Sequence, residues 1–593
     1  MKNRSFIVLI ALFLEILFFL PTFVFIYPRV TDNYLNFEQK HIEPKSSTGV
    51  DLTIVVTDQQ MPGVLDVTDE FLASPLGSGV NSVNVVSSGT TANQQLTFLT
   101  TAMGSASIAY DVIGLDVIWN AQFAKNGWII PLDSYLEPGE MDKYASGLVD
   151  ACTYDGQYYA YPYFMNLGIL WYRKDLMDKN FGVGMWSESD FATWEGLNST
   201  ANYILNNVSG SLKNPNLVGY VGQFDNYEGG TINFLEIAGS NGATDLISSN
   251  NIKFYPNTDL ADAMTFFQNL IAPQYTGVQG TPYIIPRNAL VMDEGSSIGT
   301  WIQNNSIFMR QWTFAYQSSL GAGIDFGIAP LPHFVGATDY KTSCVGGSIL
   351  AIPTFINSTQ REAAINLTKF LGMPFAQEAE LKVVSNFPAL KSVYTNPPSG
   401  YEWISNWTEQ LDQTLSRPRQ VKYPLISSVI SNEFQEILAD TKTVNAGLTS
   451  MQSNIEDILM PGSFTLSSNA NSPDTDGAFN LAWSISEGAN NYSVYKYHSF
   501  ITDINQSLTL LANQDATSPY SITGLDNGTY YYIIVAYNNY GIRLSNCISI
   551  VVEINEQNVG TILGYNGALF ILILGLTSIF LILKFARKKP SKK

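Results

Sequence analysis

The chain has 593 residues, a length that predicts two or more folded units. It carries 31 Lys and Arg against 51 Asp and Glu, a net charge of −20, and the basic residues crowd at the C-terminal end. Such an acidic body disfavours nucleic acid as a partner, because nucleic-acid binding depends on basic residues that neutralise phosphates. Aromatic residues make up 13% and charged residues only 14%, which is typical of an extracellular protein or a binder of neutral ligands.

The two ends of the chain are predicted to meet a membrane. Residues 1–30 start basic and continue almost wholly apolar, as in a signal peptide or an uncleaved anchor; without an obvious small-residue cleavage site, the anchor is favoured. Residues 561–583 carry no charge, and these 23 residues span about 34 Å as a helix, enough for a bilayer core of roughly 30 Å. The basic tail at 584–593 would then be cytoplasmic and the body extracellular.

The body begins with alternating strands and helices. Apolar strands are predicted at 51–58 and 82–89, followed by an amphipathic helix at 91–105. A third apolar run ends at Trp119, before a short polar helix. This alternation predicts a parallel sheet covered by helices. Because ligands lie at the carboxyl ends of strands in such sheets, Trp119 is either a core anchor or part of a binding site.

Composition divides the body into further segments. Residues 31–49 are polar, with Pro and Ser, and indicate a tether, whereas helix and strand patterns alternate from 50 to 462. Residues 463–472 are rich in Gly, Ser and Asn and indicate a linker. Short strands at even spacing follow over 473–555, a pattern typical of an all-β sandwich.

Residues 50–462 resemble family 1 extracellular solute-binding proteins of ABC importers, especially the maltose/trehalose-type sugar binders. The stretch WNAQFAKNGWIIPLD has the family's aromatic, short helix and Gly-hydrophobe-x-x-Pro-Leu-Asp turn. Further family motifs follow in order: DGQYYAYPY before ILWYRKDLM, TWEGLNSTA, APLP, GGSILAIP, FPALKSVY and RPRQVKY. Each is weak alone, but their order is specific. The unit at 473–555 resembles fibronectin type III domains, with Trp483 as core indole and Tyr530 near the tyrosine corner.

The resemblance implies an α/β, two-lobed, periplasmic-binding-protein-like fold of type II, followed by the sandwich and a C-terminal transmembrane helix. A hinge would join the lobes, with the ligand enclosed between them. The expected lobes are 50–161 with 344–390, and 166–340 with 395–462. The chain would cross near Pro162 and near Gly346-Gly347, where glycines suit strands that must bend.

Sugar recognition needs aromatic faces for C–H surfaces and a few fixed polar groups for hydroxyls. The resemblance places Trp119 and Trp301 as the stacking aromatics of the two lobes. The other ligand-binding positions that it implies are Asp58, Asn120, Gln122, Asn166, Tyr227, Glu228 and Tyr423. Asn166 stands where the family is often acidic, a departure that would alter selectivity. The alternative for each of these residues is a place in the core.

The cysteines are too few to hold a fold of this size together. Cys152 and Cys344 form one conceivable disulfide, with Cys547 left as a free thiol. The favoured interpretation is three small buried residues.

Catalytic motifs are poorly supported. Gly295–Gly299 matches the G-x-S-x-G pattern with Ser297 as nucleophile. The only histidines are His41, His333 and His498, two of which fall in the predicted tether and sandwich. There is no Walker loop, H-E-x-x-H or Cys/His metal spacing, so no cofactor or metal is expected. Carboxylate pairs for glycoside hydrolysis stay open.

The sequence therefore predicts a membrane-anchored extracytoplasmic receptor, not an enzyme, that captures a carbohydrate, most simply an oligosaccharide, by lobe closure. It would deliver this ligand to the permease subunits of an ABC importer, whose ATPase partner supplies the work. The sandwich would act as a spacer that raises the local concentration of receptor at the permease. The alternatives are a surface glycan-binding or adhesion protein without transport, and a surface glycosidase.

Overall fold

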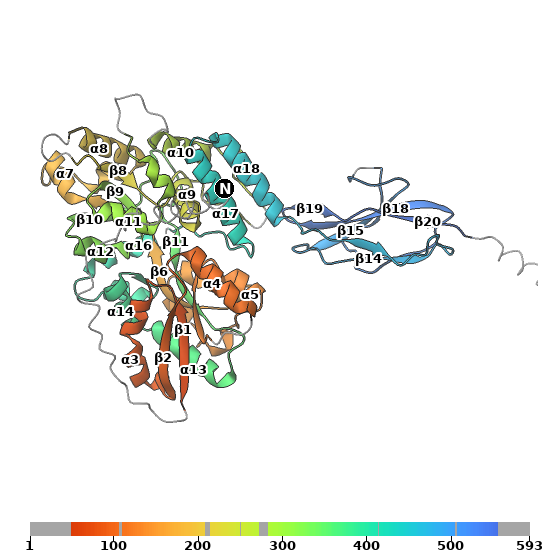
Figure 1. Cartoon of the computed structure of the whole chain (residues 1–593), viewed down its shortest axis with the longest axis horizontal. Coiled ribbons are helices and arrows are strands. Elements are labelled where there is room, and N and C mark those ends of the chain that lie inside the picture. Colours follow the sequence, from red (N-terminus) through yellow and green to blue (C-terminus); the bar gives the residue numbers. More distant parts are fainter. Residues whose placement is uncertain are drawn as a thin grey trace, which may run out of the picture.

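The computed structural model describes residues 49–105, 110–207, 214–248, 251–271, 283–412, 414–504 and 507–554. These residues form two α/β lobes and a β-sandwich that projects from one lobe (Figure 1). The predicted membrane segments, 1–30 and 561–583, and the basic tail lie outside the described residues. Among the residues described, no helix is both long and apolar enough to cross a bilayer.

Lobe 1 is built on a six-stranded sheet in the order β12-β6-β11-β3-β1-β2. Its strands are β1 (Val50–Val56), β2 (Val80–Ser87), β3 (Val112–Asp116), β6 (Tyr161–Leu167), β11 (Val345–Ala351) and β12 (Phe387–Pro388). Its helices are α2 (Met61–Asp66), α3 (Thr68–Ala73), α4 (Ala92–Ser105), α5 (Asn120–Lys125), α6 (Ser146–Ala151), α13 (Ser358–Leu371), α14 (Pro374–Val384), α15 (Lys391–Thr395) and α16 (Thr408–Asp412). β1 pairs parallel with β2 and β3, whereas β11 pairs antiparallel with β3 and β6. The predicted parallel arrangement is confirmed for β1–β3, and the sheet as a whole is mixed.

The local sequence explains the first of these elements. β1 is largely β-branched and apolar, and Leu52 and Ile54 are completely buried. α4 turns Leu99 and Met103 toward the sheet from positions four residues apart, the spacing of one helical face. α13 starts where the Asn357 side chain accepts a hydrogen bond from the Gln360 amide, 2.8 Å away, and caps the helix.

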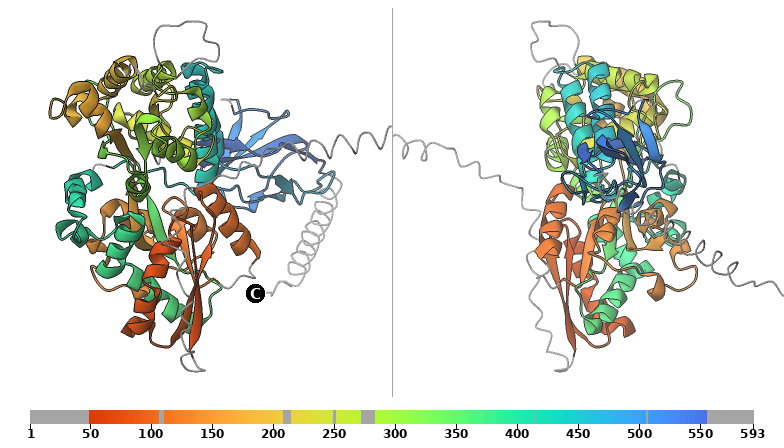
Figure 2. Two further views of the ribbon diagram at one scale, coloured as in Figure 1. Left: turned by 60° about the vertical axis from the view of Figure 1, so that its left-hand side comes forward. Right: turned by 90° about the vertical axis from the view of Figure 1, so that its right-hand side faces the viewer.

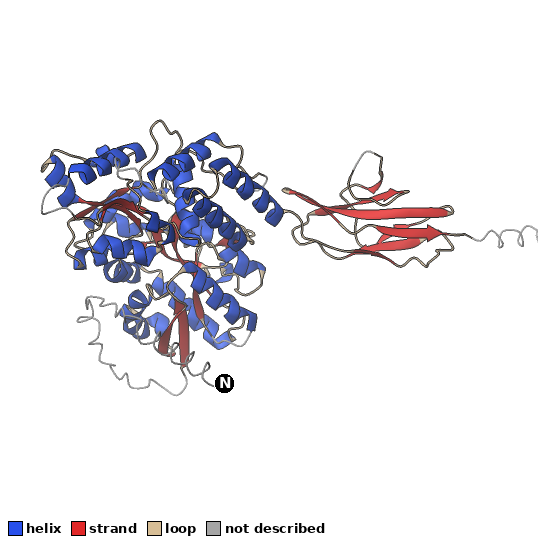
Figure 3. Cartoon of the chain, turned by 45° about the horizontal axis from the view of Figure 1, so that its top comes forward, coloured by secondary structure: helices blue, strands red, loops and turns tan. Residues whose placement is uncertain are grey.

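Lobe 2 has a four-stranded sheet in the order β10-β7-β9-β8. Its strands are β7 (Ile169–Arg173), β8 (Val218–Val221), β9 (Ser306–Gln311) and β10 (Phe326–Pro330). Its helices are α7 (Lys174–Phe181), α8 (Trp194–Asn207), α9 (Glu228–Ser240), α10 (Thr258–Leu270), α11 (Glu294–Ile302), α12 (Ala315–Gly321), α17 (Tyr423–Leu438) and α18 (Val444–Leu459). Figure 3 shows these helices packed around the strands of the lobes, apart from the sandwich.

The chain passes between the lobes at different points from those predicted. Pro162 lies inside β6, which pairs with β11 in lobe 1, so the first crossing comes only at Gly168, between β6 and β7. Gly346 and Gly347 are already part of β11 and pair with β6, so the return crossing precedes them. A third crossing lies between α16 and α17, later than the predicted break at 390–395, because residues 402–407 still pack on Phe387 of lobe 1.

A buried ion pair stands at the first crossing. Arg310 of β9 donates from Nε and Nη2 to the two carboxylate oxygens of Glu236 in α9, each over 2.8 Å, and both side chains are almost fully buried. The Glu236 carboxylate also accepts the amide of Cys344 on the returning chain, 3.1 Å away. A Cβ on Gly168 would come within 2.1 Å of this carboxylate. Glycine is therefore required here by the close passage of the ion pair.

The C-terminal unit is a β-sandwich with its own apolar core. One sheet has the order β13-β14-β17, and the other contains β16-β15-β18-β19 with β20 paired to β18. The strands are β13 (Leu466–Ser468), β14 (Phe479–Trp483), β15 (Asn491–Tyr497), β16 (Thr509–Ala512), β17 (Tyr520–Ile522), β18 (Gly528–Asn538), β19 (Gly541–Leu544) and β20 (Ile548–Val552). Trp483 is buried between the sheets, and the Tyr530 hydroxyl donates to the Asp526 carbonyl over 3.0 Å. The assignment to the fibronectin type III class stays a prediction.

The stretch 463–472, expected to be a linker, contributes to the sandwich. β13 lies within it and pairs with β14, and Phe464 and Leu466 are buried in the sandwich core. The stretch was predicted as a linker because most of its residues are polar. Phe464 and Leu466, two positions apart, point to the same face of a strand, and their burial is enough to hold a short edge strand in place.

The sandwich is docked on lobe 2 by its β18–β19 hairpin, with β19 beside α18 in Figure 1; Figure 2 shows the sandwich against the same lobe from two further sides. The Tyr540 hydroxyl donates to the Ser248 carbonyl over 2.8 Å and accepts from Gln420, 3.2 Å away on the third crossing. Asn538 donates to the last turn of α18 at Leu459, and Arg543 donates to the Pro461 carbonyl, over 2.8 and 3.0 Å. These contacts hold the sandwich against lobe 2 and the third crossing.

Because Gly168 lies so close to the Glu236 carboxylate, we expect Gly168→Ala to lower the stability of the protein strongly. The new methyl group would displace Glu236 from Arg310, so we expect a loss of about 3 kcal/mol in the free energy of unfolding, measured with chemical denaturant. Gly299→Ala is the matched control, because a Cβ there meets nothing within 4 Å; it should be neutral or stabilise α11 by up to about 1 kcal/mol. Equal stability of the two variants would show that the ion pair does not require glycine at position 168.

Candidate functional site

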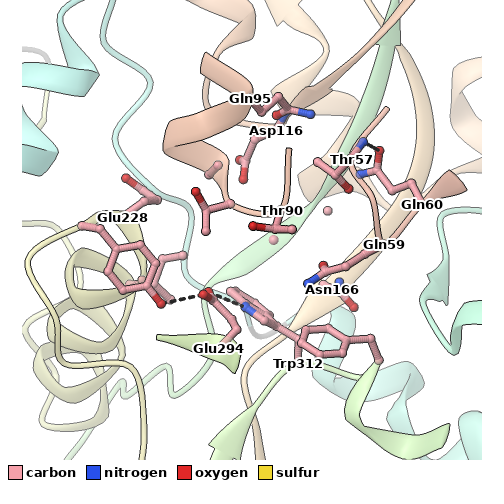
Figure 4. Close-up of a pocket in the computed structure, with 18 of the residues that line it drawn as sticks. Thr57, Gln59, Gln60, Thr90, Gln95, Asp116, Asn166, Glu228, Glu294 and Trp312 are labelled. Atoms are coloured by element: carbon pink, nitrogen blue, oxygen red, sulfur yellow. Dashed lines mark hydrogen bonds between the residues drawn. The ribbon is translucent and has the colours of Figure 1, made fainter. Parts of the chain in front are cut away.

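A cleft of about 710 Å³, open mouth included, lies between the lobes at the crossings. Lobe 1 contributes Thr57, Gln59, Gln60, Thr90, Thr91, Ala92, Gln95 and Asp116; lobe 2 contributes Tyr227, Glu228, Gly229, Ile232, Glu294, Trp312 and Phe314. Strands β6 and β11 of lobe 1 add Phe164, Asn166, Gly346 and Gly347 beside the crossings, and the third crossing adds Arg417. Figure 4 shows these polar side chains converging on one space from both lobes.

The fold brings these residues together at strand and helix ends. Thr57 and Asp116 mark the carboxyl ends of β1 and β3, and Trp312 follows β9 directly. Carboxyl ends of strands are the usual place of ligands in α/β sheets. Glu228 and Glu294 are the first residues of α9 and α11, where the positive end of the helix dipole stabilises a carboxylate.

Arg417 joins the two lobes at one wall of the cleft. Its guanidinium lies 2.7 Å from the Asp116 carboxylate of lobe 1 and 2.8 Å from the Glu228 carboxylate of lobe 2, and it donates to the Val345 carbonyl. Burial lowers the pKa of Arg417, but the two carboxylates outweigh this and raise it overall. Burial raises the pKa of Glu228, and Arg417 opposes that rise. Arg417 and Glu228 depend most on this pairing, because both are buried away from water, whereas Asp116 is partly exposed.

An aromatic wall from lobe 2 faces this triad. The Tyr227 hydroxyl donates to Glu294 over 2.6 Å, and the Trp312 indole N–H donates to the same carboxylate over 3.3 Å. The buried Arg310 guanidinium lies 3.9 Å above the Trp312 ring. A Cβ on Gly346 would come within 2.9 Å of that indole, so the glycine lets Trp312 lie close to the hinge backbone.

Asn166 connects the cleft to a buried carboxyl. It donates to Asn386 over 3.1 Å and accepts from Thr313 of lobe 2. Asn386 in turn donates to Glu380 of α14 over 2.7 Å, and the Tyr163 hydroxyl donates to the other oxygen of Glu380. Burial raises the pKa of Glu380 to about 7, and the two hydrogen bonds offset only part of that effect.

Three of the residues predicted as ligand contacts line the cleft, namely Asn166, Tyr227 and Glu228. Their carboxylate, amide and phenol groups are already hydrogen-bonded to protein neighbours. Their contact with a ligand stays a prediction.

Four further predicted residues lie behind the cleft surface. The Tyr423 ring is completely buried, its hydroxyl donates to Glu228 over 2.7 Å, and its centroid lies 6.1 Å from that of Trp119. Trp119 and Asn120 are 2% exposed. Polar atoms of Trp119, Asn120 and Gln122 are buried without a hydrogen-bond partner among the described residues: the indole Nε1, both amide atoms of Asn120 and Gln122 Oε1. Such unsatisfied groups are rare in folded proteins and call for an explanation.

Two predicted contacts are corrected by the structure. Trp301 is completely buried within lobe 2, and its indole N–H donates to Ser319 over 3.0 Å. Its place inside α11, not after a strand, makes it a core residue, and the cleft indole of lobe 2 is Trp312. Asp58 is exposed, accepts a hydrogen bond from Ser87 and is not part of the cleft lining, although its neighbours Thr57 and Gln59 are.

Other cleft residues were missed. The signal for Trp312 was present, since an aromatic directly follows the apolar strand SIFMRQ. Glu294 begins a helix after Asp293, which caps it by accepting from the Ser296 amide. Arg417 is the first residue of the motif RPRQVKY, from which only Tyr423 was taken as a ligand contact.

The remaining motifs have structural roles. All three cysteines are free, so the Cys152–Cys344 bridge is not formed, and both of these thiols are buried as the favoured interpretation had it. The Ser297 hydroxyl is buried in α11, where it donates to the Asp293 carbonyl and accepts from Gln223 and Gln311. The His333 ring stacks on Tyr340, away from Ser297, so these contacts do not support a nucleophile.

A family of known proteins shares this architecture. The sequence profile of the family described as bacterial extracellular solute-binding protein matches residues 68–408. The chain belongs to this family. It is 25% identical over 385 residues to a probable ABC transporter-binding protein of Deinococcus radiodurans, a match that spans 63% of the chain and 86% of that relative.

Solved structures confirm the predicted two-lobed fold. Maltose-bound MalE3 of T. maritima is similar with a TM-score of 0.61 and 23% identity, over 69% of the chain and 100% of that protein. The GacH receptor of Streptomyces glaucescens, solved unliganded and with acarbose, gives a TM-score of 0.57 and 17% identity, over 69% and 98%. UgpB of Mycobacterium tuberculosis with glycerophosphocholine gives 0.55 and 18%, over 70% and 99%.

Removing the cation of the triad should destabilise the solute-binding unit strongly. Arg417→Met leaves the buried Glu228 carboxylate without its cation and near the partly exposed Asp116 carboxylate, so we expect a loss of about 3–5 kcal/mol in the free energy of unfolding at pH 7.5. The loss should shrink as the pH falls, because the orphaned Glu228 has a raised pKa and protonation removes its charge. Arg419→Met is the control: its pair with Asp150 is exposed, with 3.3 Å between the groups, and is worth at most about 1 kcal/mol. A pH-independent loss would argue against the triad.

Glu380 should give the protein a distinct pH dependence. The pKa of Glu380 is about 7 in the folded chain, above its ordinary value of 4.5. The stability that this raised pKa contributes is therefore fully present below pH 4.5 and is lost as the pH rises through 7. We expect Glu380→Gln to remove this component, about 3 kcal/mol in order of magnitude. Denaturant unfolding from pH 4.5 to 8 measures it, with Glu378→Gln as the control. Parallel curves for wild type and Glu380→Gln would contradict the assignment.

Proposed function

We propose that the chain is the extracytoplasmic solute receptor of an ABC importer and that its ligand is a carbohydrate. Membership of the solute-binding family supports the receptor role. The name of the Deinococcus relative supports the link to an ABC transporter, and the maltose and acarbose complexes of similar folds support a sugar. The permease subunits and their ATPase are then the partners of the closed, loaded receptor.

The observation that carries the sugar assignment is the pairing of an indole with neutral polar groups across the cleft. Trp312 comes from lobe 2, while Gln59, Gln60 and Thr90 face it from lobe 1 (Figure 4). A flat aromatic face suits the C–H surface of a sugar ring, and amides and hydroxyls suit its hydroxyl groups. Because the two sets belong to different lobes, a ligand bound to both favours the closed arrangement.

We further propose that Trp119, Asn120 and Gln122 gain ligand contacts when the lobes separate. Their unpaired buried atoms include donors and an amide that offers both a donor and an acceptor. Trp119 contacts Tyr423, which belongs to lobe 2, so opening of the lobes would uncover this group. An oligosaccharide longer than the present cleft would extend along it.

Membrane anchoring is proposed from residues 1–30 and 561–583. The described C-terminal end, Ile554, leaves the sandwich only seven positions before the apolar run at 561. A sandwich held against lobe 2 by Tyr540 and Asn538 would present the cleft at a fixed distance from the membrane and keep it near the permease.

Ligand binding by the full chain in detergent is the test. A ligand that binds only the folded state raises stability by about 2.7 kcal/mol at a hundredfold excess over Kd. We expect thermal unfolding to shift upward with one class of sugar in a panel of maltose, trehalose, longer glucans, amino acids and polyols. Trp312→Ala should abolish the shift, whereas Trp186→Ala, at the half-buried edge of lobe 2, should keep it. A shift with amino acids alone would exclude the sugar assignment.

A further inference from the structure

The charges of the cleft are unbalanced. Four ionisable side chains line it apart from tyrosine: Asp116, Glu228, Glu294 and Arg417. The described lining contains no lysine or histidine. Three carboxylates against one guanidinium leave a net charge of −2. Adding the buried Arg310–Glu236 pair behind the wall does not change this sum.

The one cation in the described lining is already shared by two carboxylates, which makes it a poor receiver for an anionic ligand. Arg417 uses Nη2 on Asp116, Nη1 on Glu228 and Nε on the Val345 carbonyl. An anion brought to the cleft would compete with two carboxylates for this guanidinium and would meet their repulsion in a partly desolvated space. A uronate or a phosphorylated sugar is therefore disfavoured.

Glu294 is the carboxylate of the described lining without an ion pair; the buried Arg310, paired with Glu236, acts on it only through space from over the Trp312 ring. Asp116 and Glu228 share Arg417, whereas no ion pair of Glu294 occurs among the described residues. Its partners are two neutral donors, the Tyr227 hydroxyl and the Trp312 indole N–H, one on each oxygen. It is half-buried and faces the cleft beside both rings (Figure 4).

A carboxylate between two aromatic rings is a favourable place for an ammonium group. The carboxylate supplies the charge-assisted hydrogen bond, and the ring faces of Trp and Tyr attract a cation through their quadrupoles. Each oxygen of Glu294 has a single protein donor and retains acceptor capacity for a ligand N–H.

We propose that Glu294, with Trp312 and Tyr227 beside it, receives a protonated amine of the ligand, so that the cleft prefers an amino sugar to its neutral parent and rejects the corresponding uronate. This inference rests on the proposed function. It narrows the ligand from carbohydrates in general to the cationic class, and Glu294 is the residue that sets the preference.

The test compares sugars that differ only in charge. Glucose, galactose and mannose are each titrated calorimetrically into the full chain at pH 6 as the neutral sugar, the 2-amino sugar, its N-acetyl form and the uronate; amines of this kind are protonated at that pH. We expect the amino form of one scaffold to bind about tenfold or more tighter than the neutral form, and the uronate not to bind.

Variants assign the preference to its residue. Glu294→Gln should bring the amino and neutral forms to similar affinity, whereas Glu362→Gln, which removes an exposed carboxylate from α13, should leave the preference intact. Neutral sugars bound as tightly as amino sugars by the wild type, or a preference that survives in Glu294→Gln, would overturn this inference and leave the proposed function standing. No binding of any of these sugars or of the earlier panel would overturn both.

Discussion

The contact on which the arrangement of the lobes depends most is the one between Arg417 and its two carboxylates. Asp116 ends a strand of lobe 1, Glu228 starts a helix of lobe 2, and Arg417 lies on the third crossing between them. Any change in the angle between the lobes must lengthen one of these ion pairs or move the crossing segment. The cleft and the hinge are therefore one electrostatic unit, in which the charge state of the site and the position of the lobes are linked.

The crossing segment also carries the contact to the sandwich. Gln420, three residues after Arg417, donates to the Tyr540 hydroxyl of the β18–β19 hairpin. Arg419 reaches Asp150 of lobe 1 from the same segment. A short stretch of irregular chain thus touches both lobes and the sandwich. The sandwich is a structural neighbour of the hinge as well as a spacer.

The sequence predicted the general architecture because local patterns report burial. The apolar strand at 51–58 and the helix at 91–105 appear as β1 and α4 with small shifts of their ends. The two lobes were predicted from the family resemblance, which rests on the order of the motifs along the chain. The predicted crossing points were less accurate. Pro162 stays in lobe 1 because β6 pairs with β11, and such a pairing between distant strands cannot be read from the local sequence.

The site was predicted in part, for reasons that lie in individual residues. Tyr227 and Glu228 were expected from a loop where the resemblance to the family is weak, and both line the cleft. The resemblance placed Trp301 as the stacking aromatic of lobe 2, but Trp301 is a core residue of α11. The cleft indole is Trp312, which directly follows the strand that ends at Gln311. Arg417 lies in the motif RPRQVKY, but its pairing with Asp116 could not be predicted, because the two residues are 301 positions apart and no periodicity connects them.

The most direct test is a crystal structure of the full chain with a bound sugar, with the ligand chosen by titration. We expect the sugar ring between the lobes, with its C–H face against Trp312 and its polar groups toward Gln59, Gln60 and Glu294. Arg417 should still bridge Asp116 and Glu228. A sugar bound outside this cleft, or bound in it without contact to Trp312, would contradict the proposed binding site.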